Sequence, residues 1–382
     1  MILGIDASNI RSGGGLTHLA QLLRAARPGA QGFREVRVWC GEATGRELPR
    51  PPWLHVAHEP LLDGPLPARL AWQRVVLPRL AREVDMLLSP AATSPPSIHP
   101  QVVISQNMLP FEAAERQRYG ASLARLRLMA LRSMHGRAFS SADGVIFLTE
   151  YARERICAAL GPAAPRRTCI VPHGVEPRFR RPPRPARPLS ECTASDPLRV
   201  LYVSIVSPYK HQWRVAEAVG ALRRAGLFVS AEFIGAEEDP RSVARLRESL
   251  RRVDPAGGFL TMRGPVRFDE LHRHYDRAEL FVFASSCENL PNILLEAMAA
   301  GLPIACSDRG PMPEVLGDAG AYFDPEDPDD IARALRELGD DPGRRERLAA
   351  AASDRAERFT WTRCADETFG FLSEVARNPT RR

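Results

Sequence analysis

Two glutamates and one lysine are the residues of this chain whose types and spacing are best suited to chemistry. Glu288 and Glu296 lie eight positions apart. The apolar run 279–284 before them predicts a buried parallel strand, and Pro291 favours the first turn of a following helix. Glu288 is therefore expected in the strand-to-helix loop, and Glu296 about one and a half turns into the helix. In an open α/β sheet ligands bind beyond the carboxyl ends of the strands, where this loop lies.

Each glutamate also has a simpler interpretation. Glu288 would then be an acid favoured by the helix dipole, and Glu296 would belong to a solvated helix face. The position of the only lysine favours the other interpretation, in which the glutamates belong to a ligand-binding site. Among the 52 lysine and arginine residues only Lys210 is a lysine, which indicates a site that needs a compact ammonium and not a planar guanidinium. It lies between a predicted strand and helix, close to a helix N-terminus that favours phosphate.

Strand and helix patterns alternate in both halves of the chain. Repeated βα units predict two parallel, doubly wound sheets facing one another across a cleft. The predicted strands are 2–6, 35–39, 85–88, 101–105, 145–148 and 168–171, then 199–203, 228–234, 258–262, 279–284, 302–306 and 320–323. The predicted helices include 16–26, 67–82, 115–137, 241–252 and a C-terminal amphipathic helix ending at 376.

Composition agrees with two globular domains. The chain has 382 residues, too many for one compact core, and 44% of them are hydrophobic. Its seven cysteines are scattered without a C-x-x-C pair, which argues against a disulfide framework and a zinc site and favours a reducing cytoplasm. Cys287 is interpreted as a packing residue. We find no signal-peptide pattern at the N-terminus and no apolar run long enough to span a bilayer.

Positive charge is concentrated in the first half. Residues 1–195 hold 26 arginines against 15 acidic residues, whereas the remainder holds 26 basic and 31 acidic residues. The helix predicted at 115–137 mixes arginines with apolar residues. It either packs on the sheet as an ordinary amphipathic helix or binds anionic lipid headgroups. Nucleic acid is not expected as a partner, because the chain shows no aromatic stacking platform or known binding motif.

The ordered motifs of residues 199–340 resemble the family-4 glycosyltransferases, which are retaining enzymes of the GT-B fold. They are the strand and loop ending at Lys210, Phe233–Gly235, Met262–Gly264, the E-x7-E pair, Glu296–Pro303, Ser307–Val315, Gly317–Gly320 and Asp324–Pro328. The first half is similar through Gly13–Gly15, Ala142–Asp143 and Val171–Val175.

The resemblance implies a domain arrangement. An N-terminal Rossmann-like acceptor domain (1–175) and a Pro/Arg-rich linker (176–198) precede a C-terminal Rossmann-like donor domain (199–358), and a last helix (359–382) returns to the first domain.

The resemblance also implies a donor site. Lys210 and Glu288 would be catalytic, Lys210 stabilising the departing diphosphate and Glu288 binding the sugar hydroxyls, while Glu296 binds the ribose. The further donor-binding residues would be Gly14, Gly15, Arg263, Gly264, Asn289, Leu290 and Asn292. Two departures stand out. Ile205 replaces a phosphate-binding arginine, and Asn289–Asn292 replaces the usual glycines, which is expected to reshape the sugar pocket.

Acceptor binding is expected in the first domain. Gly13 belongs to a glycine cluster whose backbone N–H groups a ligand can approach closely. Gln106 and Asn107 occupy the place where such families often carry a histidine, and either can donate hydrogen bonds to sugar or acceptor hydroxyls. Asn107 alternatively caps the next helix. His173 replaces a common asparagine, and we assign it no catalytic role.

The sequence therefore predicts a metal-independent, retaining hexosyltransferase without a cofactor. It would act on a nucleoside-diphosphate sugar and a glycan or lipid-linked acceptor, in the cytoplasm or at the inner face of the plasma membrane, in bacterial surface polysaccharide synthesis. The enzyme alternatives are a GT-B nucleotide-sugar epimerase and a glycosyl phosphorylase, the latter opposed by the single lysine. The alternative of another class is a non-catalytic sugar-nucleotide binding protein.

Overall fold

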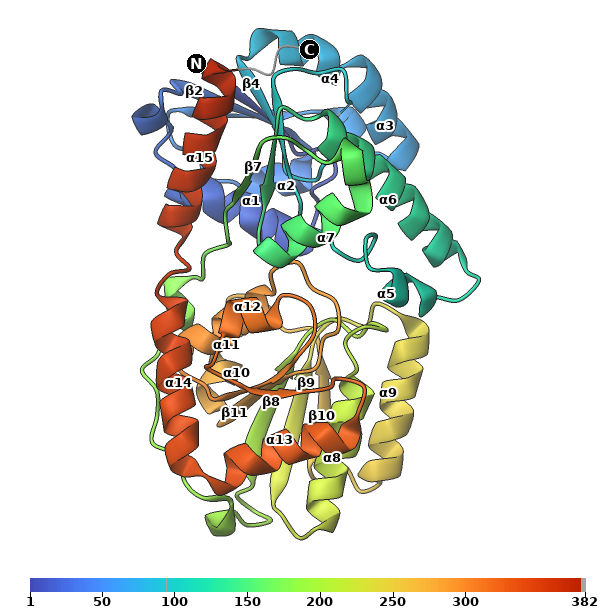
Figure 1. Cartoon of the computed structure of the whole chain (residues 1–382), viewed down its shortest axis with the longest axis vertical. Helices are drawn as coiled ribbons and strands as arrows, with labels where there is room; N and C mark the ends of the chain where they lie inside the picture. The colour runs from blue at the N-terminus through green and yellow to red at the C-terminus, as the bar shows by residue number, and fades with distance from the viewer. Residues whose placement is uncertain (94, 379–382) are drawn as a thin grey trace. The chain divides into compact units, whose positions relative to one another are not determined.

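The structure, a computed structural model, describes residues 1–93 and 95–378. The chain separates into two compact units, and each is an α/β domain built on a parallel sheet (Figure 1). Unit 1 contains Met1–Ala113, Ala121–Gly174 and Thr360–Arg382, and unit 2 contains Ala114–Gly120 and Val175–Phe359. Two doubly wound parallel-sheet domains are the fold class predicted from the sequence.

The sheet of unit 1 has seven strands in the order β3-β2-β1-β4-β5-β6-β7. Every neighbouring pair is parallel, so each connection is a crossover. The strands are β1 (Ile2–Asp6), β2 (Glu35–Cys40), β3 (Leu54–His58), β4 (Met86–Ser89), β5 (Gln101–Ile104), β6 (Gly144–Phe147) and β7 (Thr168–Ile170).

The sheet of unit 2 has six parallel strands in the order β10-β9-β8-β11-β12-β13. The strands are β8 (Leu198–Val203), β9 (Val229–Ile234), β10 (Leu260–Gly264), β11 (Leu280–Phe283), β12 (Ile304–Ser307) and β13 (Ala321–Phe323). Every residue of β11 and β12 is buried, as expected for central strands covered by helices on both faces.

Helices connect the strands of both units. Before the linker they are α1 (Gly13–Ala25), α2 (Glu42–Glu47), α3 (Leu66–Val75), α4 (Leu77–Leu80), α5 (Ala113–Gln117), α6 (Leu123–Ser141) and α7 (Glu150–Leu160). After it they are α8 (Gln212–Arg224), α9 (Pro240–Val253), α10 (His272–Arg277), α11 (Asn292–Ala299), α12 (Met312–Leu316), α13 (Pro328–Asp340), α14 (Pro342–Ala356) and α15 (Trp361–Arg377). Asp239, Asp341 and Thr360 cap three of these helices by accepting backbone N–H groups.

The last helix, α15, packs within unit 1 although unit 2 precedes it in the sequence (Figure 1). A Cβ atom on Gly144 of β6 would lie 2.8 Å from the ring of Phe371, so the glycine makes room for this aromatic side chain. Cys364 of α15 places its sulfur 3.8 Å from Nε2 of His18 in α1. The helix is therefore part of the unit 1 core.

Three sequence predictions about these elements were wrong. Gly13–Gly15 form the first turn of α1 instead of a loop before a helix at Leu16, with Gly13 at a φ of +67°. The helix predicted at 115–137 is two helices, because Gly120 adopts a φ of +56° between α5 and α6. Strand β3 was missed, since its two histidines, His55 and His58, and the flanking prolines hide the apolar pattern.

Candidate active site

Two neighbouring strands of unit 2 bring the predicted catalytic residues together. Strands β8 and β11 are adjacent and parallel, so the loops that follow them lie at the same edge of the sheet. The loops are joined directly, since the backbone N–H of Ser286 donates to the carbonyl oxygen of Tyr209 at 2.9 Å. The side-chain hydroxyl of Ser286 donates to the same carbonyl at 3.3 Å. Lys210 and Glu288, one on each loop, are thereby held side by side.

Lys210 and Glu288 form an ion pair through Nζ and Oε1. Their side chains are 7% and 15% exposed, so the pair is largely removed from water. Lys210 Nζ also lies 5.0 Å from the ring centroid of Tyr209 and 5.4 Å from that of Phe283, distances suited to cation–π attraction. The only lysine of the chain is therefore a desolvated cation at the edge where a ligand of this fold binds. It contacts the first glutamate of the E-x7-E pair.

The end of α8 next to Lys210 adds polar groups to this edge. His211 adopts a φ of +50° at the N-cap of α8, and its Nε2 lies 2.9 Å from the Ser286 hydroxyl. Burial lowers the pKa of His211 to about 4, which keeps its imidazole neutral at pH 7. The 13-residue helix α8 thus begins two residues after Lys210, and a helix N-terminus next to a lysine favours an anion such as a diphosphate.

Glu296 occupies a different environment from Glu288. It is buried in α11 and accepts a hydrogen bond from the Tyr275 hydroxyl at 2.9 Å. Burial raises the pKa of Glu296 to about 7, and the Tyr275 hydrogen bond only partly offsets this. The interpretation of Glu296 as a solvated face residue is therefore wrong. So is the helix-dipole interpretation of Glu288, because that carboxylate precedes α11 and pairs with Lys210.

The segment between the two glutamates leads into a helix without a side-chain cap. Pro291 is the N-cap of α11 and provides no capping oxygen, so the first N–H groups of that helix lack a capping partner. Asn289 and Leu290 are buried beside it, and Oδ1 of Asn292 is buried without a hydrogen-bond partner. These groups can bind sugar hydroxyls, which is the role the resemblance implies for them.

Arg263 and Gly264 lie at the end of β10. Arg263 forms an ion pair with Glu232 of β9, so its charge is compensated within the sheet. The carbonyl oxygen of Gly264 accepts the N–H of Gly235 at 2.9 Å, and Gly264 has a φ of +78°. In the part of the chain that the structure describes, the ion pair of Arg263 is with Glu232 and that of Lys210 is with Glu288, so the two pairs are separate.

The predicted residues of unit 1 form a second, uncharged cluster. A Cβ atom on Gly15 would lie 3.2 Å from Oε1 of Gln106, so the glycine turn and the loop after β5 are in close approach. Nε2 of Gln106 lies 2.6 Å from Nδ1 of His18, a buried side chain whose pKa burial lowers to about 4. Asn107 accepts the N–H of Leu109 at 3.1 Å, which favours its interpretation as a local turn residue.

His173 joins this cluster, although the sequence assigned it no role. Its ring lies 4.5 Å from that of His18 and 5.9 Å from that of Trp361. Burial and the neighbouring His18 hold the pKa of His173 well below its usual range. The two neutral histidine rings pack edge to face, which supports a structural role in holding the first half of α1.

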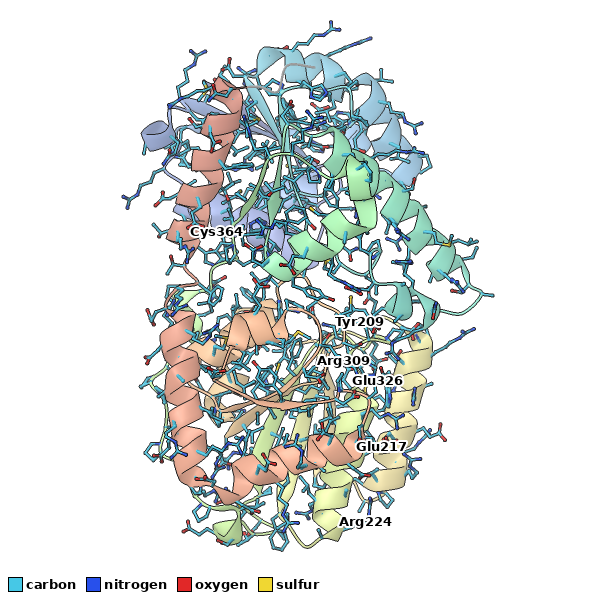
Figure 2. The ribbon with its side chains drawn as sticks, in the orientation of Figure 1. Tyr209, Glu217, Arg224, Arg309, Glu326 and Cys364 are labelled. Atoms are coloured by element: carbon cyan, nitrogen blue, oxygen red, sulfur yellow. The ribbon has the colours of Figure 1, made fainter. Side chains whose placement is uncertain are left out.

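The sequence placed the segment Ala114–Gly120 in the N-terminal domain, but the segment lies within unit 2. Arg118 makes a bidentate ion pair with Glu326, at 2.9 and 2.6 Å. Burial raises the pKa of Tyr119, while a hydrogen bond from Ser207 lowers it, so this phenol reaches the loop that carries Lys210. Figure 2 shows Glu326 together with Tyr209 and Arg309. The helical pattern of this segment could be predicted, but its place in unit 2 could not, because its contact partners Ser207 and Glu326 lie in the other half of the chain.

Two negative findings concern the described residues alone. Within 1–93 and 95–378 no group of three or more histidine, cysteine, aspartate or glutamate side chains is arranged to hold a metal ion. Over the same ranges, no helix combines the length and the apolar character that crossing a bilayer requires.

Unit 2 is the part of the chain that matches a known protein family. The family model described as "Glycosyl transferases group 1" matches residues 197–341. The matched segment is therefore similar to the group 1 glycosyltransferases. It contains both the Lys210 loop and the E-x7-E pair.

Curated relatives agree with this match. The chain is 38% identical over 112 residues to O-antigen chain mannosyltransferase B of Escherichia coli, covering 29% of each chain. It is 31% identical over 229 residues to a D-inositol 3-phosphate glycosyltransferase of Geodermatophilus obscurus, covering 56% of this chain and 49% of the relative. The chain thus spans about half, or less, of the length of these two relatives.

Solved structures extend the likeness to the whole chain. Sucrose-phosphate synthase from Thermosynechococcus elongatus superposes with a TM-score of 0.76 at 18% identity, covering 98% of this chain and 99% of that one. The Anabaena protein HepE, in complex with UDP-glucose, gives 0.71 at 15% identity, covering 98% and 100%. At these identities the superpositions show the fold, which is GT-B.

Proposed function

We propose that this chain transfers a hexose from a nucleoside-diphosphate sugar to a glycan or lipid-linked acceptor. The observation that carries the proposal is the desolvated Lys210–Glu288 pair at the carboxyl edge of the unit 2 sheet, inside the segment that matches group 1 glycosyltransferases. The names of the relatives, a mannosyltransferase and an inositol phosphate glycosyltransferase, support the same reaction class.

The proposed chemistry follows from charge. Breaking the bond between the anomeric carbon and the diphosphate leaves negative charge on the leaving group and positive character on the sugar. The Lys210 ammonium and the N-terminus of α8 would stabilise the departing phosphate, because both are fixed in a poorly hydrated place before the reaction begins. Glu288 would orient Lys210 and accept hydrogen bonds from sugar hydroxyls.

The remaining assignments of the proposal concern the second substrate and the stereochemistry. Gln106 and Gly13 of unit 1 would bind the acceptor through uncharged donors, and Gly14 and Gly15 would contribute to donor binding. Transfer would retain the anomeric configuration and need no metal ion, and bacterial surface polysaccharide synthesis is the proposed setting. The complex of HepE with UDP-glucose supports a UDP-sugar as the first donor to test.

We further propose that the protein works in the cytoplasm, peripherally at an anionic membrane surface. The first turns of α6 support this, since Leu123, Leu126 and Met129 are 84%, 61% and 54% exposed. Arg125 and Arg127 lie on the same turns and Arg132 follows. Apolar side chains among arginines suit an interface where the former enter the acyl boundary and the latter meet phosphates.

The test is a donor panel. UDP-, GDP-, ADP- and TDP-sugars are first screened for thermal stabilisation, and stabilising donors are then assayed for sugar transfer to lipid-linked and soluble glycans. NMR of the product reports the anomeric configuration. Binding without turnover, for every donor and acceptor, would favour a sugar-nucleotide binding protein, and conversion of the donor sugar without transfer would favour an epimerase.

A further inference from the structure

A cavity lies at the edge of the unit 2 sheet opposite to the edge that carries Lys210. It has a volume of about 190 Å³ and is lined by the segments that lead into three parallel strands. Arg199 is the second residue of β8, Glu279 directly precedes β11, and Gly301–Pro303 precede β12. The linker contributes Arg184–Arg187, and α14 contributes Arg345. This amino-terminal edge has no part in the proposed transfer reaction.

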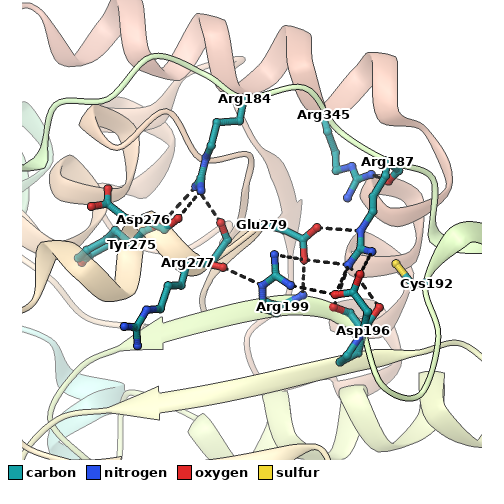
Figure 3. A network of polar contacts seen from close by, with 12 residues as sticks. Arg184, Arg187, Cys192, Asp196, Arg199, Tyr275, Asp276, Arg277, Glu279 and Arg345 are labelled. Atoms are coloured by element: carbon teal, nitrogen blue, oxygen red, sulfur yellow. Dashed lines mark hydrogen bonds and ion pairs between the residues drawn. The ribbon is translucent and has the colours of Figure 1, made fainter.

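Four arginines and one carboxylate line the cavity, and two of the arginines are compensated (Figure 3). Arg187 Nε lies 3.0 Å from Glu279 Oε1, and Arg199 lies 3.2 Å from Glu279 Oε2. Asp196 pairs with both guanidinium groups, at 3.1 Å from Arg199. These two cations and two carboxylates therefore balance one another.

The other two arginines have no such balance. Arg184 donates to the carbonyl oxygens of Ala278 at 2.8 Å, Tyr275 at 3.2 Å and Asp276, as Figure 3 shows. Arg345 donates to the carbonyl oxygen of Arg187, and its Nε is buried without a hydrogen-bond partner. Within the described chain neither guanidinium is in an ion pair with a carboxylate.

The cost of an uncompensated charge falls on Arg345, whereas Arg184 lies exposed at the cavity. Arg345 is only 1% exposed, and burial lowers the pKa of both Arg184 and Arg345. A buried charge without a partner loses its hydration and gains no opposing charge. A guanidinium fork matches the oxygens of a phosphate, and an anion between these side chains would compensate both charges.

The cavity volume limits the ligand. A water molecule occupies about 30 Å³ in the liquid, so the cavity has room for a tetrahedral anion with a few waters. It is too small for a nucleotide sugar, since pockets for ligands of that size usually exceed about 300 Å³. We infer that this cavity, formed by Arg184, Arg345 and the amino ends of β8 and β11, binds a phosphate-sized dianion. The anion would fasten the linker to the sheet of unit 2.

Inorganic phosphate added to the full chain tests the inference. The melting temperature should rise by roughly 2–4 °C once phosphate reaches about five times its dissociation constant, compared with chloride at equal ionic strength. Arg184→Gln should abolish this rise in melting temperature. In Arg345→Lys, the same rise should require a phosphate concentration at least tenfold higher. Arg251→Gln on the exposed face of α9 removes the same charge elsewhere and should leave the response unchanged.

A further variant separates this cavity from the proposed diphosphate site. Lys210→Ala should keep the phosphate response, because its side chain lies at the other edge of the sheet. Loss of the response in Lys210→Ala with retention in Arg184→Gln would overturn the inference, as would the absence of any response in the unaltered chain. Glycerol phosphate in place of inorganic phosphate shows whether the site takes free phosphate only or also a phosphate group carried by a larger molecule. Equal stabilisation by both compounds would indicate a site that admits phosphomonoesters. Stabilisation by inorganic phosphate alone would indicate a site closed to them. Either result supports an anion site.

Discussion

The two units carry the same kind of sheet but opposite kinds of ligand-facing chemistry. Unit 2 places a buried ion pair, Lys210–Glu288, on adjacent loops after β8 and β11. Unit 1 places neutral groups, Gln106, His18 and the glycine turn, at the start of α1. A diphosphate needs fixed positive charge, whereas hydroxyl groups need donors and acceptors without charge. The contrast supports the proposal that unit 2 binds the nucleotide sugar and unit 1 the acceptor.

The largest effect is expected from removing the positive charge of Lys210 in unit 2. Lys210→Ala should lower kcat by roughly 10²–10³-fold, about 2.7–4 kcal/mol, as expected for deletion of one preorganised electrostatic group. Lys210→Arg should rescue only partly, since the guanidinium fork differs from a compact ammonium. Steady-state kinetics with the best donor measure both. Wild-type turnover in the alanine variant would remove Lys210 from the mechanism.

A double variant controls for damage to the ion pair. Removing one partner of a buried pair leaves the other uncompensated, so part of the loss in Lys210→Ala reflects Glu288. Lys210→Ala with Glu288→Gln should cost clearly less than the sum of the two single changes. Additive losses would show that the two side chains act separately.

The second test concerns the buried carboxyl of Glu296 in the same unit. Its raised pKa of about 7 means that the protonated form is favoured in the folded state. Its contribution to stability is therefore complete below about pH 4.5 and is lost as the pH rises through about 7, by up to about 3 kcal/mol. Urea unfolding at several pH values should show this slope.

Glu296→Gln is the matched control, because a neutral amide cannot titrate. The slope between pH 4.5 and 7 should flatten in this variant. If Glu296 binds the donor ribose as a carboxylate, donor affinity should also rise with pH through about 7 and lose that dependence in the glutamine variant. A slope that persists in Glu296→Gln would place the titration elsewhere.

The third test asks whether unit 1 meets a membrane. Arg125, Arg127 and Arg132 changed together to glutamine should weaken binding to anionic vesicles by about 1 kcal/mol per arginine at low salt. Cosedimentation at increasing salt measures the effect, and wild-type binding should fall steeply. The matched control changes Arg224, Arg241 and Arg251 of unit 2, which removes equal charge. Equal binding to neutral vesicles, or none at low salt, would favour a soluble acceptor.

The fourth test probes the uncharged cluster. Gln106→Ala should lower kcat/KM for the acceptor by roughly 2–10-fold, the effect of losing one neutral hydrogen bond, and leave donor affinity unchanged. Gln117→Ala, on the exposed surface of α5, is the control. A change in donor affinity alone would show that Gln106 binds the donor and not the acceptor.

The smallest expected effect is that of a chelator. Lysine and helix N-termini would replace a metal in stabilising the diphosphate, so activity should be unchanged in EDTA. Turnover assays before and after dialysis against EDTA measure this. Activity that disappears and returns with manganese would contradict the proposed mechanism.

Periodicity predicted nearly all strands, because fully buried parallel strands read as apolar runs whatever their neighbours are. Lys210 and Glu288 could also be found, the first by its rarity and the second by its place after a strand. The burial of Glu296 could not, since it depends on Tyr275 from another helix. Arg118 and Glu326 are 208 positions apart, and no local pattern predicts such a contact. The arginine-lined cavity is likewise assembled from linker, strand ends and α14.

The placement of α15 has a consequence for how the protein is made. Unit 1 needs Phe371 against β6 and Cys364 beside α1, yet these residues are translated only after all of unit 2. Domains usually fold in the order of synthesis. Here the unit begun first is completed last, because its core waits for a helix encoded after all of unit 2. The nascent chain must therefore keep an unfinished seven-stranded sheet from aggregating while unit 2 is translated.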